Sequence, residues 1–235
     1  MKFLRIAIDG PVAAGKGTVA RSLAERLGIL YVDTGAMYRA AALLARREGV
    51  DWQDAEAVAA LVEKAEIELR RPSGDEEDGR LTTVLANGGD VSKDIRTEEI
   101  SWGSSIVSAH GPVRDVLVEK QRQIVEGQSV VMEGRDIGRN VLPEADIKFF
   151  LTAALEERAR RRYLELLGRG QQVTYEEVER YVRERDERDM LREVDPLQQL
   201  PDAIVVDTTG LSIEAVVGLV ESRVRELVDF SKEGQ

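Results

Sequence analysis

The sequence of 235 residues contains no cysteine and a single histidine, and its aromatic residues make up only 5% of the chain. Without cysteine the chain has no disulfide and no thiolate metal site. Long hydrophobic runs are absent as well, so we expect no membrane-spanning segment and no membrane partner. The N-terminus carries a strand-like run rather than a signal sequence, which favours a cytoplasmic location.

The charge balance is acidic, with 44 Asp and Glu residues against 33 Lys and Arg and a formal net charge of −11. A surface of that sign repels a nucleic acid duplex, so we expect no nucleic acid partner. The chain is 43% hydrophobic and 33% charged, which is enough apolar material to bury one full core. We expect a soluble monomer of one domain with small appendages.

Short β-branched runs alternate along the chain with longer amphipathic stretches, which is typical of a parallel sheet wrapped by helices. The expected strands are 3–8, 29–32, 129–132, 147–151 and 203–206. The expected helices are 15–27, 36–48, 54–65, 112–126, 155–167, 174–192 and 212–228. Several of the strands are continuous apolar runs, as expected where helices cover both faces of a sheet. The pattern therefore predicts an α/β fold.

The pattern changes between residues 64 and 100. Two short strand-like runs, Ile67–Leu69 and Leu81–Leu85, flank an acidic, glycine-containing turn from Ser73 to Gly79. An Asn87-Gly88-Gly89 turn follows. These features predict a small antiparallel insert on the parallel core.

A glycine-rich segment follows the first expected strand and opens the first expected helix, with the sequence DGPVAAGKGT from Asp9 to Thr18. Gly10 and Gly15 let backbone N–H groups turn inward around a polyphosphate, and the helix presents its partly positive N-terminus to the same charge. Lys16 can then reach the β- and γ-phosphates. The expected phosphate-binding residues are Gly10, Pro11, Val12, Ala13, Ala14, Gly15, Lys16, Gly17 and Thr18.

This segment departs from the common phosphate-loop pattern in two places. Gly17 stands where Ser or Thr usually follows the lysine, and Thr18 comes one place later. That ending is similar to the nucleoside monophosphate kinases, and it leaves both the magnesium role of Thr18 and the other protein ligands of magnesium open. Val12 and Ala13 replace the smaller residues often found in the loop.

Two polar clusters follow two of the expected strands, at the edge of an open α/β sheet where ligands bind. The first, Asp33 to Arg39, places Arg39 for a bidentate contact to a phosphate, although the start of this segment could instead cap the next helix. The second, Glu133 to Gly138, sets Arg135 beside Asp136 between two glycines, which allows close approach to a phosphate. The alternative for this pair is a solvated turn.

One face of the expected helix 174–192 carries four charged residues, namely Arg185, Arg188, Asp189 and Arg192. Their spacing brings them to the same side of the helix. The alternative to a binding face is a ladder of surface salt bridges, each worth about 0.3–0.5 kcal/mol.

A second arginine cluster precedes the glycine-flanked Arg169 and consists of Arg158, Arg160, Arg161 and Arg162. An arginine-dense helix followed by such a turn suits a mobile lid that closes over transferring phosphates. An ordinary solvated basic face is the alternative.

Together with Asp94-Ile95-Arg96 and Val113-Arg114, these motifs resemble bacterial cytidylate kinase in order and over almost the whole chain. The resemblance implies a P-loop NTPase-type parallel sheet flanked by helices, and transfer of the γ-phosphoryl group of ATP to CMP or dCMP with Mg²⁺ present. It assigns 64–100 to a monophosphate-binding insert and 153–172 to an arginine-rich lid. The core would then be residues 1–63, 101–152 and 173–228.

The resemblance also implies a role for each site residue. Arg39 and Arg135 would hold the phosphate of the acceptor. The residues implied around the cytosine are Thr34, Arg114, Asp136 and Arg192, and those implied at the sugar are Ser105, Arg185 and Asp189. The implied catalytic residues are Lys16, Arg135, Arg158 and Arg162, with Arg161 as an alternative lid arginine.

Two other functions remain open at this point. A kinase with UMP or AMP as its acceptor would share the loop and the arginine lid. A nucleotide-binding switch would share the loop, although the chain has no Asn-Lys-x-Asp element to read guanine. Phosphoryl transfer needs no nucleophile from the protein, so we expect the lone His110 to be a surface or packing residue.

Overall fold

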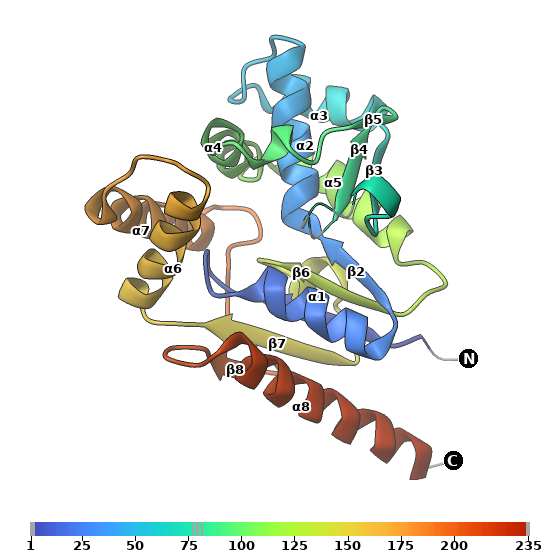
Figure 1. The fold of residues 1–235 in the computed structure, drawn as a ribbon. Coiled ribbons are helices and arrows are strands. Elements are labelled where there is room, and N and C mark those ends of the chain that lie inside the picture. The colour runs from blue at the N-terminus through green and yellow to red at the C-terminus, as the bar shows by residue number, and fades with distance from the viewer. Residues whose placement is uncertain (1–2, 77, 79, 81, 234–235) are drawn as a thin grey trace.

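Five parallel strands form the central sheet in the order β2-β6-β1-β7-β8. The computed structural model describes residues 3–76, 78, 80 and 82–233, and Figure 1 draws it as a ribbon. The strands are β1 (Arg5–Asp9), β2 (Leu30–Asp33), β6 (Val130–Gly134), β7 (Ile147–Thr152) and β8 (Ile204–Asp207). Each of them overlaps an expected strand, so the predicted parallel α/β fold is confirmed.

A helical layer covers each face of the sheet, because successive residues of a strand point to opposite faces. On the face that carries Ile6 and Ile8, the covering helices are α1 (Lys16–Leu27) and α8 (Ile213–Glu233), which lie side by side in Figure 1. On the face that carries Ala7 and Met132, they are α2 (Thr34–Arg47), α3 (Ala55–Lys64) and α5 (Gly111–Ile124). The two apolar cores form the bulk of the molecule.

The strand order brings three strand ends to one edge of the sheet. In the parallel register Asp9 of β1 is level with Gly134 of β6, and Asp33 of β2 is level with Glu133. The segments that follow β1, β2 and β6 therefore meet at the carboxyl edge, which is where open α/β sheets bind ligands.

Three short strands form a second, antiparallel sheet: β3 (Ile67–Arg70), β4 (Thr83–Ala86) and β5 (Gly89–Asp90). Ile67 pairs with Ala86, and Arg70 pairs with Thr83. The predicted antiparallel segment is confirmed. The expected strand start at Leu81 and part of the expected turn 73–79 lie outside the described residues.

The sequence pattern did not predict α4 (Glu98–Val107). Its sequence, EEISWGSSIV, contains serine and glycine, which have weak helix preference. Thr97 caps the helix by accepting the N–H of Ile100 at 3.2 Å. Packing on neighbouring elements requires Gly103, because a Cβ there would lie 2.6 Å from the ring of Trp52. Tertiary contacts therefore stabilise this helix more than its own sequence does.

A helical hairpin of α6 (Leu155–Gly168) and α7 (Tyr175–Leu191) stands beside the carboxyl edge of the sheet in Figure 1. Leu166, Val178 and Val182 form its small apolar core. Thr174 and Glu177 form a capping box that starts α7. Within the described part of the chain, neither these helices nor any others combine the length and apolarity of a membrane span.

Gly10, directly after β1, has φ +149°, and a Cβ built on it would lie 2.0 Å from the carbonyl oxygen of Leu151 in β7. We expect Gly10→Ala to destabilise the fold by about 3 kcal/mol or more, because a rare backbone conformation and a steric clash add together. Gly28→Ala is the control, since Gly28 has φ +67° and open space around its Cβ position; it should lose only about 1–2 kcal/mol. Urea unfolding measures both losses, and equal losses would contradict the close approach.

Candidate active site

The loop between β1 and α1 has the geometry of an anion-binding nest. Gly15 has φ +89° and Ala13 has φ +57°, so the backbone is left-handed at both positions. Lys16 begins α1 and is 5% exposed, and its Nζ donates to the carbonyl of Pro11 at 2.8 Å. The ammonium group thus lies over the loop and the helix N-terminus, where backbone N–H groups favour an anion.

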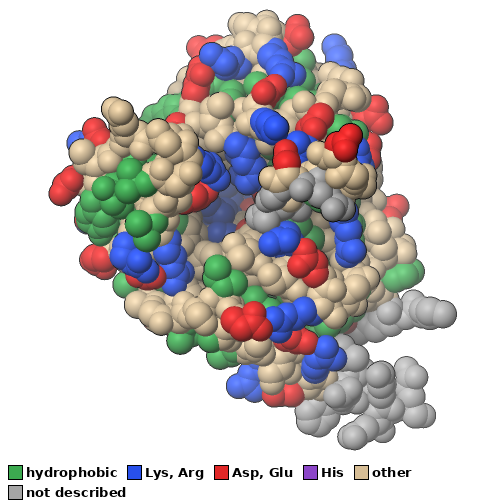
Figure 2. All heavy atoms as spheres, viewed as in Figure 1, with side chains coloured by type: hydrophobic (Ala, Val, Ile, Leu, Met, Phe, Trp, Pro, Cys, Tyr) green, Lys and Arg blue, Asp and Glu red, His purple; other side chains and the backbone are tan. Residues whose placement is uncertain are grey.

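This loop forms one wall of an open cavity of about 300 Å³. Figure 2 shows the hollow, with Lys and Arg side chains gathered in it. The residues with a catalytic or binding role assigned from the sequence that line it are Val12, Ala13, Gly15, Lys16, Gly17, Thr18, Thr34, Arg39, Arg114, Arg135, Asp136, Arg162, Arg185, Asp189 and Arg192. The structure thus brings together segments that lie far apart in the sequence.

Five of the residues to which the sequence analysis assigned a catalytic or binding role do not line the cavity, namely Gly10, Pro11, Ala14, Ser105 and Arg158. Ala14 is fully buried beneath the loop. The Oγ of Ser105 accepts a hydrogen bond from Nε of Arg188 at 3.0 Å. Arg158 is 7% exposed and forms an ion pair with Asp186, so its guanidinium is held inside the α6–α7 hairpin.

Burial and a like charge perturb Lys16. Burial and the neighbouring guanidinium of Arg135 lower the pKa of Lys16 to about 7. Burial and the carboxylate of Asp33 raise the pKa of Glu133, whose Oε1 accepts a hydrogen bond from the hydroxyl of Tyr31 at 3.0 Å. Buried groups with shifted pKa values are typical of functional sites.

Asp9 connects the ends of β1 and β6. Its carboxylate accepts the N–H groups of Ile137 and Gly138 at 2.8 and 2.9 Å. Burial nevertheless raises the pKa of Asp9 to about 6. These two bonds fix the backbone that follows Arg135 and Asp136, so the second polar cluster has a defined position relative to the phosphate loop.

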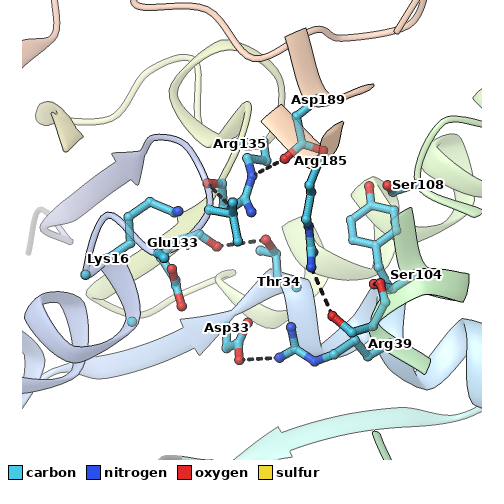
Figure 3. A pocket seen from close by; sticks show the side chains of 18 of the residues that line it. Lys16, Asp33, Thr34, Arg39, Ser104, Ser108, Glu133, Arg135, Arg185 and Asp189 are labelled. Carbon is cyan, nitrogen blue, oxygen red and sulfur yellow. Dashed lines mark hydrogen bonds and ion pairs between the residues drawn. The ribbon is translucent and has the colours of Figure 1, made fainter. Parts of the chain in front are cut away.

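Arg39 and Arg135 are held by carboxylates at the cavity wall, as Figure 3 shows. Nη2 of Arg39 donates to Oδ2 of Asp33 at 2.8 Å, and Nε of Arg135 donates to Oδ2 of Asp189 at 2.6 Å. Asp33 also accepts the N–H of Ala36 at 2.9 Å and caps α2. The capping alternative and a place in the site therefore coexist at Asp33.

Arg114 of α5 is 1% exposed and forms an ion pair with Asp136. Nε of Arg114 also donates to Oδ2 of Asp195 at 3.1 Å. The other oxygen of Asp136 accepts from Nη2 of Arg192 at 3.2 Å. A guanidinium donor and a carboxylate acceptor thus lie side by side at the cavity wall, which is complementary to a base edge that sets a ring acceptor beside an amino donor.

The charged residues of α7 face α4 and the cavity. Nη1 of Arg185 donates to Oγ of Ser101 at 3.0 Å and to the hydroxyl of Tyr181 at 2.8 Å. Arg188 stacks on the ring of Trp102, 4.3 Å from its centroid. In Figure 3 Arg185 and Asp189 point from α7 toward the space that Arg135 and Lys16 also face. The alternative of a surface salt-bridge ladder is therefore wrong for this helix face.

The arginines of α6 divide into different environments. Arg162 lines the cavity and pairs with Glu98 of α4 and with Glu165. Arg161 donates to the carbonyl of Thr208 at 2.7 Å. The side chain of Arg160 is 56% exposed, as expected for a solvated face. Of the arginines of this cluster, Arg162 alone lines the cavity.

The cavity is also lined by residues to which sequence analysis gave no role, including Tyr38, Arg96, Ser101, Ser104, Ser108 and Glu133. Nη2 of Arg96 lies 3.8 Å from Oδ2 of Asp33, on the carboxylate that also holds Arg39. The Asp94-Ile95-Arg96 motif was a sequence signal that could have identified Arg96 as a residue of the site. The three serines share one side of α4 and its C-terminal cap, so they could be recognised only once that helix was known.

His110 does not contribute to the cavity. Its Nε2 lies 2.8 Å from the carbonyl oxygen of Trp52, and the residue directly precedes α5. The expectation of a local packing role is confirmed.

The chain is similar to known proteins in both sequence and structure. A family model described as cytidylate kinase matches residues 6–226. The cytidylate kinase of Citrifermentans bemidjiense is 49% identical over 221 residues, which cover 94% of this chain and 92% of that protein. The cytidylate kinase of Bacillus subtilis (strain 168) is 47% identical and covers 96% of this chain and 98% of its own length. That of Carboxydothermus hydrogenoformans is 51% identical, with coverages of 91% and 94%.

Among solved structures, an uncharacterized protein from Eubacterium ventriosum ATCC 27560 matches with a TM-score of 0.53. It covers 96% of this chain and 99% of its own, at 12% sequence identity. At that identity the match shows a shared fold.

The low pKa of Lys16 makes its effect on stability depend on pH. The usual pKa of a lysine is 10.5. Between about pH 7 and 10.5 the unfolded chain therefore binds more protons than the folded chain, and the stability of the fold rises with pH. The destabilisation from burying the charge is complete below about pH 7. We therefore expect Lys16→Met to stabilise the fold most near pH 6 and progressively less toward about pH 10.

Urea unfolding of wild type and Lys16→Met at both ends of that range measures the difference. Lys93→Met is the control, because the Lys93 side chain is 81% exposed. A difference for Lys16→Met that does not change with pH would contradict the assignment of a depressed pKa.

Proposed function

Because the chain belongs to the cytidylate kinase family, we propose that it transfers the γ-phosphoryl group of ATP to CMP or dCMP, giving ADP and CDP or dCDP. The enzyme is a phosphotransferase. One observation carries the proposal: a single cavity joins the phosphate loop with Lys16 to a second set of cations around Arg39 and Arg135. Two phosphate-binding ends in one cavity suit a donor and an acceptor.

In this proposal the donor lies along the loop 10–18, with Lys16 on its phosphates. The acceptor's own phosphate oxygen attacks, so the protein has to align the two nucleotides and neutralise charge rather than form a covalent bond. Alignment alone can contribute up to about 7–11 kcal/mol to lowering the barrier. Lys16, Arg135 and Arg162, all on the cavity wall, would balance the charge that develops on the transferring group.

The acceptor subsite follows from the geometry opposite the loop. Arg39 and Arg135 would hold its phosphate. Arg114 and Asp136 would meet the base edge, with Thr34 and Arg192 beside them. Arg185 and Asp189 would meet the sugar. The Ser105 hydroxyl accepts a hydrogen bond from Arg188, so the sugar would have to reach Ser105 from the side of Arg185 and Asp189.

The single domain would consist of three functional parts, a core, an insert and a lid. We assign residues 1–63, 101–152 and 173–228 to the core, 64–100 to a monophosphate-binding insert and 153–172 to a lid. Arg162 on the cavity wall supports the lid assignment. The antiparallel sheet of residues 64–100 supports the insert assignment, and so does Arg96, which lines the cavity.

Magnesium would be held mainly through the phosphates of ATP and water. Within the described residues, no group of three or more His, Cys, Asp or Glu side chains could hold a metal ion. That fits Mg²⁺, which usually binds few carboxylates and keeps several waters. When bound, Mg²⁺ would neutralise charge on the phosphates of ATP, and Thr18 and Glu133, which line the cavity with Lys16, are the residues that would orient its water shell.

The proposal includes a monomer in the cytoplasm, where both nucleotides are available. The two sets of cations that the reaction would use, around Lys16 and around Arg39 and Arg135, lie in one cavity of this chain, so the proposed reaction requires no residue from a second subunit.

A coupled assay of ADP release tests the function with CMP, dCMP, UMP and AMP as acceptors. We expect CMP and dCMP to be used, and kcat/KM for UMP to be at least about tenfold lower, since uracil reverses the donor and acceptor positions of cytosine. A preference for UMP or AMP would overturn the acceptor assignment. ADP release that does not depend on any acceptor would overturn transfer itself.

Asp136→Asn tests how the base is read. A carboxylate can only accept a hydrogen bond and suits the cytosine amino group, whereas an amide can turn its N–H toward the uracil carbonyl. We expect the variant to lower kcat/KM for CMP and to narrow the CMP-to-UMP ratio by about tenfold.

Asp195→Asn is the matched control for this test, because Asp195 also pairs with Arg114 but does not line the cavity. It should leave the ratio of the two acceptors unchanged. A ratio that stays constant in Asp136→Asn would show that Asp136 does not read the base.

A further inference from the structure

Val12, at the tip of the phosphate loop, is held through both of its backbone groups by side chains of the α6–α7 hairpin. Its N–H donates to Oδ1 of Asp186 at 3.3 Å. Its carbonyl accepts from Nη1 of Arg158 at 3.2 Å. The loop tip is therefore hydrogen-bonded to one residue from each helix of the hairpin.

The two side chains that hold Val12 also hold one another. Arg158 and Asp186 form an ion pair, and their side chains are only 8% and 10% exposed. Nε of Arg158 donates to the carbonyl of Ala153 at 2.9 Å, which fixes the guanidinium at the start of α6. If Arg158 turned toward a bound phosphate, it would leave Asp186 buried without its cation, which is strongly unfavourable.

The side chain of Val12 adds an apolar contact to these bonds. It packs against the small hairpin core of Leu166, Val178 and Val182. An alanine or glycine here would leave that core open on the loop side. The next residue, Ala13, has φ +57°, so the backbone directly after Val12 is in a conformation that L-residues rarely adopt and that its surroundings must maintain.

We propose that Arg158 and Asp186 are positioning residues that fasten the phosphate loop to the base of the α6–α7 hairpin through Val12. Arg158 then acts on the loop and not on the transferring phosphate, which differs from the role implied by the family resemblance. The hairpin is fixed where it meets the loop, so the lid movement is restricted to its far end, the turn 169–174 and the adjacent helix ends. The inference rests on the proposed function only in naming ATP as the ligand of the loop.

One consequence concerns the amides that are free for phosphate. The Val12 N–H is directed to Asp186, so the nest is formed by the amides that follow it, up to the start of α1. Their direction depends on where Val12 is held. We call the contacts of Arg158 and Asp186 with Val12 the brace. Loss of the brace should therefore weaken the binding of ATP and have little effect on the binding of the acceptor.

The test compares Arg158→Ala, Asp186→Asn and the double variant in steady-state kinetics. We expect KM for ATP to rise about tenfold in each single variant, with kcat and KM for CMP changed less than about threefold. The double variant should resemble the single ones, because each change disrupts the same brace. Arg160→Ala is the matched control on the same helix and should resemble wild type.

Hydrogen exchange provides a second measurement that needs no activity. Without nucleotide, the amides of residues 12–16 should exchange at least about tenfold faster in Asp186→Asn than in wild type, while those of α5 are unchanged. Val12→Ala, which keeps both backbone bonds but loses the apolar contact, should show a smaller increase at the same residues. If Arg158→Ala or Asp186→Asn fails to fold, Val12→Ala still tests the inference.

Two results would overturn the inference. One is a loss of kcat of about a hundredfold or more in Arg158→Ala with near-native kinetics in Asp186→Asn, which would place Arg158 on the phosphate. The other is unchanged exchange of residues 12–16 in Asp186→Asn. If wild type instead transferred phosphate to none of the acceptors while loop exchange rose as expected, the proposed function would fail and the brace would stand.

Discussion

The site depends on one electrostatic constraint: several cations must be held in one small cavity before any phosphate is bound. The chain as a whole carries a net charge of −11, yet lysine and arginine side chains gather in a hollow of about 300 Å³. Carboxylates make this stable, as Asp33 does for Arg39 and Asp189 does for Arg135. Lys16 instead donates to a backbone carbonyl, and burial with Arg135 nearby lowers its pKa to about 7. The acidic composition and the basic site are therefore parts of the same arrangement.

These ion pairs orient the arginines without using up their donors. Arg135 gives its Nε to Asp189, and Arg39 gives Nη2 to Asp33, while the Nε of Arg39 is buried without a hydrogen-bond partner. A guanidinium has five N–H donors in a fixed fork, so one bond to a carboxylate sets the direction of the rest. A phosphate that enters the cavity can add bonds to an arginine that is already directed, and little side-chain freedom remains to be lost.

Local pattern predicts the sheet and the phosphate loop well, because both depend on properties that short segments carry. Strands covered on both faces are continuous apolar runs, and the positive φ at Gly10 and Gly15 is accessible to glycine. The position of α4 could not be found in this way, since packing on Trp52 stabilises a segment with weak helix preference. The burial of Arg158 could not be predicted from the sequence for a related reason. Sequence spacing does not determine whether an arginine faces a cavity or a neighbouring helix, and here Asp186 on α7 decides it.

α7 connects the parts of the site whose separation matters most for in-line transfer. Asp186 contacts Val12 of the phosphate loop, Asp189 contacts Arg135, and Arg192, the C-terminal cap, contacts Asp136 of the pair proposed to read the base. A helix rises 1.5 Å per residue, so these contacts are spread over about 9 Å along one axis. Because a helix is stiff, α7 sets the distance from the phosphate loop to Asp136, and α4 holds it laterally through Ser101 and Trp102. A displacement of about 1 Å between reacting groups can change a rate by two orders of magnitude, so in the proposed reaction the alignment of donor and acceptor depends on this one helix keeping its register.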